Sequence, residues 1–467
     1  MKKKKFYLAI DLGGSGGRAS IASINNGKIE HKIIHRFKDY QQLLNGHRHW
    51  DIIKIFAEIK KSIKLADNIC GENLVSIGID SWGVDYCYID KSGALISNPY
   101  SYRDNRTNEI YDKIFEIISK EEIYSMTGVQ FMKFNTIGQI YSDKLIRPWI
   151  FDIAEYFLMI PDLLNYFLTG CINLEKTNLS TTQLYDPEIM DLAKPILKRL
   201  EIPKSIFPEI IEPGIKIANL NKEITEELGL DNNEIEVVSV ASHDTASAIA
   251  AIPIRDQNSV YIINGTWSLL GLELNKPMIN QKAMSKNFTN EVGVEGSIRF
   301  LKNITGLWLL EKCKDHWEKE QQEELSYEEL DNKASKAEPD LFIIDPDDKS
   351  FNKPNNIPKK IKNYCKKTGQ KVPENKGQII RCIYESLANS YAKKINDLEE
   401  LVDKKINKIH MAGGGARSKV FCKIVEEKCQ RKVKIGPIEA TVYGNILAQL
   451  KSSGEINSIR EARIKLI

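Results

Sequence analysis

Asp244 has the setting that best suits acid–base chemistry. It follows a short β-branched strand at 236–240 and precedes the alanine-rich segment 246–252. In one interpretation the carboxylate caps the N-terminus of a helix, which is common for Asp. In the other it is a general base that takes the proton of a hydroxyl receiving a phosphoryl group, at a helix end whose N–H groups and dipole attract that group. The spacing alone leaves both interpretations open.

A glycine-rich turn, Gly13–Arg18, follows the apolar run 6–10 and Asp11. It can be a dinucleotide-binding turn, a hairpin that needs glycine at positive φ, or a phosphate loop between antiparallel strands. A dinucleotide turn must lead into a helix, whereas residues 19–24 alternate and then reach an Asn-Gly turn. In the phosphate-loop interpretation, Asp11 would face Mg²⁺ on a nucleotide. The Walker pattern of P-loop enzymes is absent.

Two further turns could serve a nucleotide. Asn264-Gly265-Thr266 lies between two expected strands, and Gly413-Gly414-Gly415 lies between a strand and a helix. Each can be an ordinary connection. Paired with the first hairpin, the 264–266 turn would grip phosphates, and the uncluttered backbone at 413–415 could pack against adenine or ribose.

The elements that must position these turns indicate an α/β protein. Expected in the first part are a strand meander over 6–33, a helix over 52–66, a strand over 74–79 and mostly helical structure over 105–230. The strand–turn–strand pattern starts again at 260–274, about 255 residues later, which suggests two related lobes joined near Pro253. A charged helical stretch (312–340), an irregular Lys/Asn-rich excursion (345–376), a helix (377–402), a strand (408–412) and a helix through Cys429 are expected to complete the second part.

Composition excludes several classes of protein. The 467 residues carry 66 Lys and Arg against 63 Asp and Glu, and this balance argues against a nucleic-acid-coating protein. The sequence contains no run of about 18–20 apolar residues, the length needed to span a bilayer as a helix. The basic start, Met1–Lys5, leads into an apolar run too short for a signal peptide. Eight cysteines without a C-x-x-C pair favour a reduced, cytoplasmic protein.

Several motifs, in order and spacing, resemble the FGGY family of carbohydrate kinases, in the actin-like ATPase superfamily. The resemblance runs from about Leu8 to about Leu450 and is to the branch that phosphorylates L-rhamnulose. The stretches that carry it are 8–18, 76–85, 102–107, 131–139, 242–248, 265–268 and 302–310.

The resemblance implies two ribonuclease-H-like lobes of the actin and hexokinase type, with a catalytic cleft between them. Residues 1–248 would form the sugar-binding lobe with the first phosphate loop, and residues 249–467 the nucleotide-binding lobe. The last helix, from about residue 443, is a candidate for packing back on the first lobe. The implied reaction moves the γ-phosphate of ATP to the 1-hydroxyl of L-rhamnulose, in L-rhamnose catabolism. A kinase for L-fuculose or xylulose, and a catalytically silent sugar or nucleotide sensor on the same fold, remain alternatives.

The resemblance also implies roles for individual residues. Asp244 would be the catalytic proton acceptor, and Asp11 would help to hold Mg²⁺ through water. ATP would contact Gly14, Ser15, Gly16, Gly17, Arg18, Thr266, Glu311 and Gly414, and the sugar would contact Gly83, His243, Asp244, Thr245 and Asn303. The sequence departs from the family pattern at three places. Gly14 stands where the family usually has Ala or Thr, and Arg417-Ser418 also differs. Glu311 stands where some members carry a Gln, so only hydrogen-bond acceptance is left at 311. The expected partners are the ketose and ATP, with no nucleic acid or membrane, in a monomer or small homo-oligomer.

Overall fold

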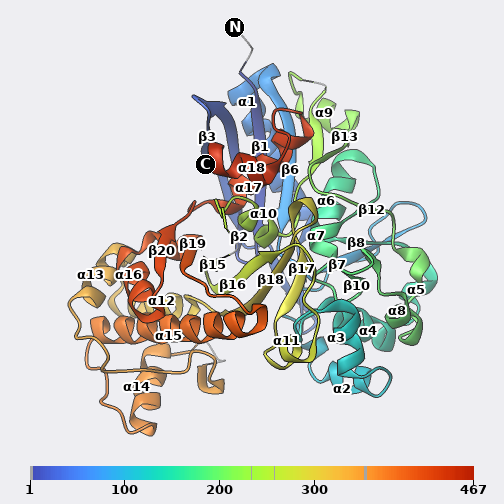
Figure 1. Cartoon of the computed structure of the whole chain (residues 1–467). Helices are drawn as coiled ribbons and strands as arrows, with labels where there is room; N and C mark the ends of the chain where they lie inside the picture. Colours follow the sequence, from blue (N-terminus) through green and yellow to red (C-terminus); the bar gives the residue numbers. More distant parts are fainter. Residues whose placement is uncertain (1–3, 233, 257, 352–354) are drawn as a thin grey trace. The chain divides into compact units, whose positions relative to one another are not determined.

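The computed structural model describes residues 4–232, 234–256, 258–351 and 355–467. Small parts of the basic start (1–3) and of the Lys/Asn-rich segment (352–354) lie outside the described residues. The chain divides into two compact units, and this division is not linear along the sequence (Figure 1). Unit 1 contains Met1–Pro253, Leu274–Phe300 and Ala440–Ile467; unit 2 contains Ile254–Glu273 and Leu301–Glu439.

The sheet of unit 1 has the strand order β13-β14-β6-β1-β2-β3. Strands β1 (Phe6–Gly13), β2 (Gly16–Asn25) and β3 (Lys28–Lys38) form the antiparallel meander predicted from the sequence. On the other side of β1, β6 (Leu74–Ser81) and β14 (Glu236–Ser239) run parallel to it, and β13 (Ile215–Asn219) closes the edge. Residues 7–12 of β1 are all buried, as expected for a central strand covered on both faces.

Helix α1 (Ile52–Cys70) covers one side of this sheet and is one turn longer than predicted. Ile52, Ile55, Ile59 and Ile63 recur at helical spacing and are fully buried. The helix begins at Asp51, whose side chain accepts a hydrogen bond from the backbone N–H of Lys54 at 3.1 Å.

The segment 105–230 is mixed rather than mostly helical, because short strands between its helices pair with residues far along the chain. Its helices are α2 (Ile110–Phe115), α3 (Lys120–Thr127), α4 (Thr136–Ile146), α5 (Ile150–Ile153), α6 (Ile160–Thr169), α7 (Lys176–Leu179), α8 (Lys194–Arg199) and α9 (Lys222–Leu228). Its strands, besides β13, are β8 (Ala154–Met159), β9 (Leu174–Glu175), β10 (Tyr185–Asp186), β11 (Asp191–Leu192) and β12 (Ile210–Ile211). Strand β8, for example, pairs with β7 (Tyr86–Asp90). Earlier in the chain, β4 (Gln41–Leu44) and β5 (His47–Trp50) form a separate hairpin.

Unit 2 is built on strands in the order β18-β16-β15-β19-β20. These are β15 (Ser259–Asn264), β16 (Trp267–Leu274), β18 (Ile298–Thr305), β19 (Lys408–Ala412) and β20 (Lys432–Ile435). Strand β18 enters the unit from unit 1, where β17 (Thr289–Val292) precedes it. Strands β15, β19 and β20 are parallel, and the order matches β3-β2-β1-β6-β14 of unit 1. The two related α/β lobes suggested by the sequence pattern are therefore present.

The helices of unit 2 correct two expectations. The stretch 312–340 is split into α12 (Trp308–Gln321) and α13 (Tyr327–Ser335), because Ser326 and Glu329 form a capping box that starts a new helix. The segment 345–376 is not all irregular: α14 (Ile357–Lys367) buries Ile357, Ile361 and Cys365 between its lysines. Helices α15 (Lys376–Val402) and α16 (Lys419–Cys429) agree with the helices predicted over 377–402 and up to Cys429. In the part of the chain that is described, no helix is long and apolar enough to cross a membrane.

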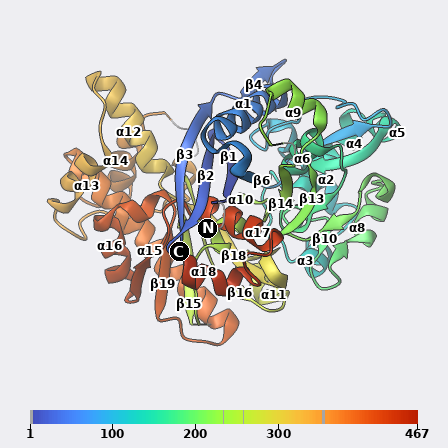
Figure 2. The same ribbon diagram turned by 90° about the horizontal axis from the view of Figure 1, so that it is seen from above.

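The end of the chain belongs to unit 1. Helix α17 (Ala440–Ser452) packs on β1, β6 and α10 (Asp244–Ala250), and α18 (Ile459–Leu466) follows it (Figure 2). A buried polar network ties α17 to the strands: Gln449 donates to the carbonyl of Leu8 at 3.0 Å and accepts from Ser76 at 2.6 Å. Gly444 lets α17 approach α10 closely, because a Cβ there would collide with the backbone carbonyl of Ser247.

Gly444→Ala should therefore destabilise unit 1. Adding a methyl group between two packed backbones forces them apart, at a cost of about 1–3 kcal/mol in the free energy of unfolding. Urea unfolding followed by tryptophan fluorescence measures this cost. Gly436→Ala is the matched control, since the atoms nearest to its new Cβ lie at 3.5 Å and should leave the midpoint almost unchanged. Equal stability of the two variants would contradict the close helix packing.

Candidate functional site

Three aspartates lie at the end of the unit 1 sheet where its parallel strands finish; we call this end the sheet edge. Asp11 on β1 is in register with Asp80 on the adjacent parallel strand β6. The next residue, Ser81, forms a parallel bridge with His243, so that Asp244 follows at the same edge. A hydrogen bond of 2.8 Å from Ser81 N to Ser242 O holds the two segments together. The carboxyl ends of parallel strands are where α/β proteins bind ligands.

The first two aspartates are stabilised in different ways. Asp11 accepts two hydrogen bonds from Arg18, of 2.8 and 2.5 Å, across the β1–β2 hairpin. Asp80 is fully buried, and burial together with the charge of Asp11 raises its pKa well above the usual range. Asn445 of α17 donates to Asp80 Oδ2 at 2.6 Å and partly opposes this rise, whereas Oδ1 has no hydrogen-bond partner in the described chain.

Asp244 is the first residue of α10 and does not cap it. The cap position belongs to His243, and Asp244 Oδ1 instead accepts from the backbone N–H and hydroxyl of Thr245, at 2.5 and 3.0 Å. The capping interpretation is therefore wrong. The side chain is 30% exposed, and Oδ2 accepts no hydrogen bond from the described residues. Burial raises the pKa of Asp244, His243 opposes the rise and Asp11 adds to it. One oxygen is thus held by Thr245, and the other has no donor among the described residues.

A buried carboxylate that the sequence did not single out positions the loop before Asp244. Glu175 Oε2 accepts hydrogen bonds from the backbone N–H and hydroxyl of Ser242, at 3.1 and 2.7 Å. The same oxygen accepts from the hydroxyl of Thr177 at 2.6 Å, and Oε1 accepts from the Thr177 N–H at 2.8 Å. Burial raises the pKa of Glu175, and these hydrogen bonds counteract it. Glu175 therefore fixes the strand-to-helix turn that presents Asp244.

The glycine-rich turn is a two-residue hairpin, so the dinucleotide interpretation is excluded. Gly13 pairs with Gly16, and Gly14 and Ser15 form the tip, with Ser15 exposed. None of the glycines from Gly13 to Gly17 has positive φ. Their role is close approach: a Cβ at Gly14 would lie 2.7 Å from the hydroxyl of Tyr102, and one at Gly17 would overlap the ring of Phe37. The glycines thus let the side chains of Tyr102 and Phe37 pack directly against the hairpin backbone.

The loop after β6 holds strained backbone at Gly83-Val84. Val84 has φ of 69°, a conformation that β-branched residues rarely adopt. Three hydrogen bonds enforce it: its N–H donates to Thr181, and its carbonyl accepts from Thr136 and Gln139. Gly83 lies against Thr181, 3.0 Å from the position of a Cβ. Such enforced strain clusters at ligand sites, and it lies beside the residue expected to contact sugar.

Asp85 ties this loop to its surroundings. Its buried carboxylate accepts from the indole N–H groups of Trp50 and Trp82, at 2.6 and 3.0 Å. It also accepts from Tyr102 N at 3.0 Å and from Gln139 at 2.8 Å. Burial raises the pKa of Asp85 to about 6, although the hydrogen bonds from Gln139, Trp50 and Tyr102 and the charge of Arg106 limit the rise.

Unit 2 brings its own predicted residues together. Gly413 (φ 79°) and Gly415 pack directly on Asn264, so the turns 264–266 and 413–415 are neighbours. Thr266 donates its hydroxyl hydrogen to Glu311 of α12 at 3.0 Å. Burial raises the pKa of Glu311, and the bond from Thr266 opposes the rise. Gly414 borders open space, and Asn303 lies half-buried on β18. The turns are thus adjacent, whereas Asn303 comes from a different strand.

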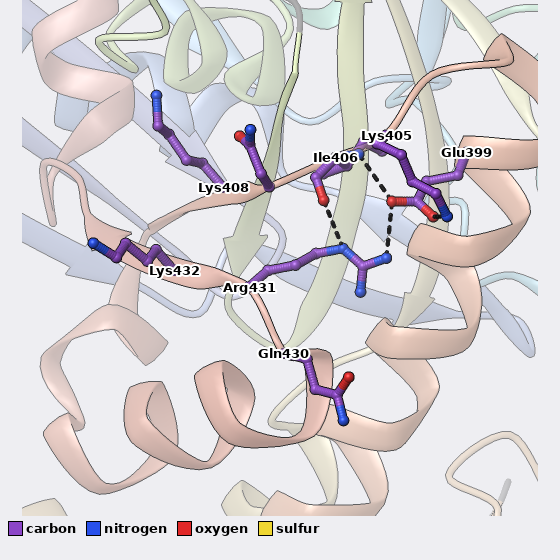
Figure 3. A pocket seen from close by; sticks show the side chains of 8 residues that line it. Glu399, Lys405, Ile406, Lys408, Gln430, Arg431 and Lys432 are labelled. Carbon is purple, nitrogen blue, oxygen red and sulfur yellow. Dashed lines mark hydrogen bonds and ion pairs between the residues drawn. The ribbon is translucent and has the colours of Figure 1, made fainter.

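A separate pocket of unit 2, of about 550 Å³, contains none of the predicted site residues (Figure 3). It is lined by Glu399, Lys405, Ile406, Asn407, Lys408, Gln430, Arg431 and Lys432. Glu399 pairs with Arg431 at 2.9 Å and with Lys405 at 3.1 Å, and Lys408 pairs with Asp256 at 2.7 Å. Burial disfavours the charge of Glu399, but the Ile406 N–H and these cations lower its pKa to about 2. Three of the four cationic side chains in the lining therefore have a carboxylate partner, and Lys405 and Arg431 share the same one.

Sequence reasoning assigned no role to Asp80, Glu175, Glu291 or Arg299, all of which support the edge that carries Asp244. Arg299 lies fully buried in the apolar run 298–301, and a charged residue in such a run was the available signal. Its partner, Glu291, lies on the preceding strand β17, with Oε2 3.0 Å from Arg299 Nη1. In the described chain, no group of three or more His, Cys, Asp and Glu side chains could hold a metal by itself.

Comparison with known proteins covers nearly the whole chain. The N-terminal domain model of the FGGY family of carbohydrate kinases matches residues 6–250, and the C-terminal domain model matches residues 260–453. The rhamnulokinase of Bacteroides thetaiotaomicron is 39% identical over 460 residues, covering 98% of this chain and 93% of that protein. The rhamnulokinase of Bacillus subtilis is 38% identical over 459 residues, covering 98% and 92%.

Solved structures show the same fold of two mixed α/β domains at low identity. Gluconate kinase from Lactobacillus acidophilus aligns with a TM-score of 0.79 at 16% identity, over 98% of this chain and 91% of that one. Glycerol kinase from Plasmodium falciparum, solved with ADP, aligns with a TM-score of 0.78 at 16% identity, over 98% and 92%. The expected α/β fold class is confirmed.

Asp85→Asn should change how stability depends on pH. Because the folded pKa of about 6 exceeds the unfolded value, the folded state keeps a proton that the unfolded state has lost, and stability falls as pH rises from about 4 to about 6. The variant has no proton to lose at this position, so its stability should not fall in this way. The difference in free energy of unfolding between wild type and variant should therefore shrink by at most about 1.4 kcal/mol per pH unit as the pH rises. Urea unfolding at several pH values, read by tryptophan fluorescence, measures it. Exposed Asp152→Asn is the control, and a gap independent of pH would contradict the raised pKa.

Proposed function

The chain belongs to the FGGY family of carbohydrate kinases, and we propose that it transfers the γ-phosphate of ATP to the 1-hydroxyl of L-rhamnulose. The products are L-rhamnulose 1-phosphate and ADP, and the reaction belongs to L-rhamnose breakdown. The choice of sugar is supported by relatives that are rhamnulokinases at 38–39% identity along almost the full chain.

The observation that carries the proposal is the state of Asp244. One carboxylate oxygen is fixed by Thr245 and the other accepts no hydrogen bond from the described residues. A general base needs this combination of a fixed orientation and a free lone pair. The sugar hydroxyl would give its proton to Oδ2 as its oxygen bonds to the γ-phosphorus, while the bond from phosphorus to the β–γ bridging oxygen breaks and ADP leaves.

We assign the substrate contacts to residues of both units. Gly83, His243, Thr245 and Asn303 would contact the sugar. The hairpin residues Gly14, Ser15, Gly16 and Gly17 would contact ATP through backbone N–H groups, and Arg18 would contact it through its positive charge. Thr266, Glu311 and Gly414 would contact the rest of the nucleotide, and Glu311 would accept hydrogen bonds there, as from ribose hydroxyls.

The carboxylates at the sheet edge fit a magnesium ion carried by ATP. Mg²⁺ keeps several waters and binds proteins through one or two carboxylates plus substrate phosphates, which agrees with the lack of a three-ligand cluster in the described chain. Asp11 would hold the ion through water, with Asp80 beside it in register. When bound, Mg²⁺ neutralises charge that develops on the phosphates.

Asp244→Asn should fold normally and bind ATP with unchanged affinity, yet lose about 10²- to 10⁴-fold in kcat, because an amide cannot accept the hydroxyl proton. Coupled detection of ADP measures turnover, and calorimetry measures ATP binding. Asp112→Asn makes the same chemical change at an exposed position and should keep full activity. Full activity of Asp244→Asn would remove this residue from the mechanism.

A panel of ketoses decides the sugar. With L-rhamnulose, L-fuculose and xylulose as acceptors, kcat/KM for ADP release should be highest for L-rhamnulose by at least about 10-fold, as expected when hydroxyl contacts are matched or left unpaired. A clear preference for another ketose would replace the proposed substrate. No ADP release with any of the sugars would favour the silent sensor, whereas ADP release that does not depend on a sugar would indicate ATP hydrolysis and contradict the proposed transfer.

A further inference from the structure

A buried ion pair lies beside Nδ1 of His243. Arg299 is fully buried on β18, and Glu291 on β17 is 5% exposed. Arg299 Nη1 lies 3.0 Å from Glu291 Oε2. The Arg299 charge lowers the pKa of Glu291 despite burial, so the carboxylate stays ionised beside the guanidinium. Burying such a pair costs free energy, because both ions lose their hydration.

The guanidinium is fixed on both sides by backbone carbonyls. Arg299 Nε donates to Val292 O at 2.9 Å, and Nη2 donates to Thr177 O at 3.4 Å. From this position both Nη atoms lie 3.2 Å from Nδ1 of His243. A guanidinium carries only donors, so the atom it faces must be an acceptor. A hydrogen bond from Arg299 to His243 therefore requires a lone pair and no hydrogen on Nδ1.

Glu291 offers the competing arrangement. Its Oε2 lies 3.4 Å from His243 Nδ1, close enough to attract a hydrogen on that nitrogen. Such a hydrogen would, however, point toward two guanidinium N–H groups that are nearer to Nδ1. The geometry thus favours the imidazole tautomer with its hydrogen on Nε2.

We propose that Arg299 is a positioning residue that fixes His243 as the Nε2–H tautomer, so that the imidazole presents a donor to the sugar site. Nε2 lies 3.5 Å from Asp244 Oδ1, on the side of the ring away from Arg299. The significance for the sugar rests on the proposed function. His243 would then donate to an oxygen of the ketose, while Asp244 accepts from the hydroxyl that reacts. The site would present one donor and one acceptor side by side.

The position of the hydrogen can be measured directly. In nitrogen-15 NMR of the full chain labelled at histidine, the His243 signals, assigned by their loss in His243→Gln, should show a protonated Nε2 and an unprotonated Nδ1. A neutron crystal structure of the unsubstituted protein gives the same information if that variant does not fold. A hydrogen on Nδ1, alone or together with one on Nε2, would overturn the proposal.

Variants separate positioning from simple structural support. The double variant Arg299→Met with Glu291→Gln removes both charges and leaves neither unpaired. It should raise KM for the sugar about 10-fold with KM for ATP unchanged, and its His243 signals should show both tautomers. Arg299→Lys keeps a cationic donor and should restore most of the sugar KM. Arg463→Met, which removes another buried arginine of unit 1, should leave both KM values unchanged.

The outcomes distinguish this inference from the proposed function. The tautomer is measured without substrate, so a different preferred ketose would leave it standing. A double variant with a single unchanged tautomer and unchanged KM for the sugar would make Arg299 merely structural, even if the ketose panel selects L-rhamnulose. Equal increases in both KM values for the double variant and for Arg463→Met would likewise overturn the positioning role.

Discussion

Parallel pairing of neighbouring strands is the constraint on which unit 1 depends. The register of β1 with β6, and the bridge between Ser81 and His243, bring Asp11, Asp80 and Asp244 to one sheet edge. Carboxylates so placed repel one another, and burial makes the repulsion more costly. Each carboxylate accepts hydrogen bonds from a different partner: Asp11 from Arg18, Asp80 from Asn445 and Asp244 from Thr245. Residues of β2, α10 and α17 thus stabilise the three carboxylates at this edge.

A second set of buried polar groups gives the edge its rigidity. Glu175 fixes the turn before Asp244, and Asp85 fixes the strained loop after β6 through two indoles. Each of these carboxylates is satisfied by several donors, which makes burial tolerable. Groups held in this way need little rearrangement when substrate binds, which is how enzymes stabilise developing charge. The arrangement suits the proposed transfer of a phosphoryl group.

Sequence reasoning succeeded where local pattern decides structure. The hairpin at Gly13–Arg18, the buried strands and the position of Asp244 after β14 all follow from residues adjacent in the chain. It failed where distant segments decide. Glu175 binds Ser242, 67 residues away, and Arg299 contacts His243, 56 residues away, and no pattern of neighbouring residues predicts such pairs. One of the open interpretations gave the hairpin glycines positive φ, but none of them has it; Tyr102 and Phe37, remote in sequence, instead require small residues at Gly14 and Gly17.

The return of the last helix to unit 1 has a consequence for biosynthesis. Asn445 and Gln449, which bind Asp80, Leu8 and Ser76, leave the ribosome more than 360 residues after the strands that they join. At about 5–20 residues per second, the strands wait tens of seconds for these partners. Unit 2 ends at Glu439, so all of its residues have been synthesised before α17 emerges. The nascent chain therefore finishes its oldest part last, and a ribosome that stops early releases a protein whose sheet edge has never been closed.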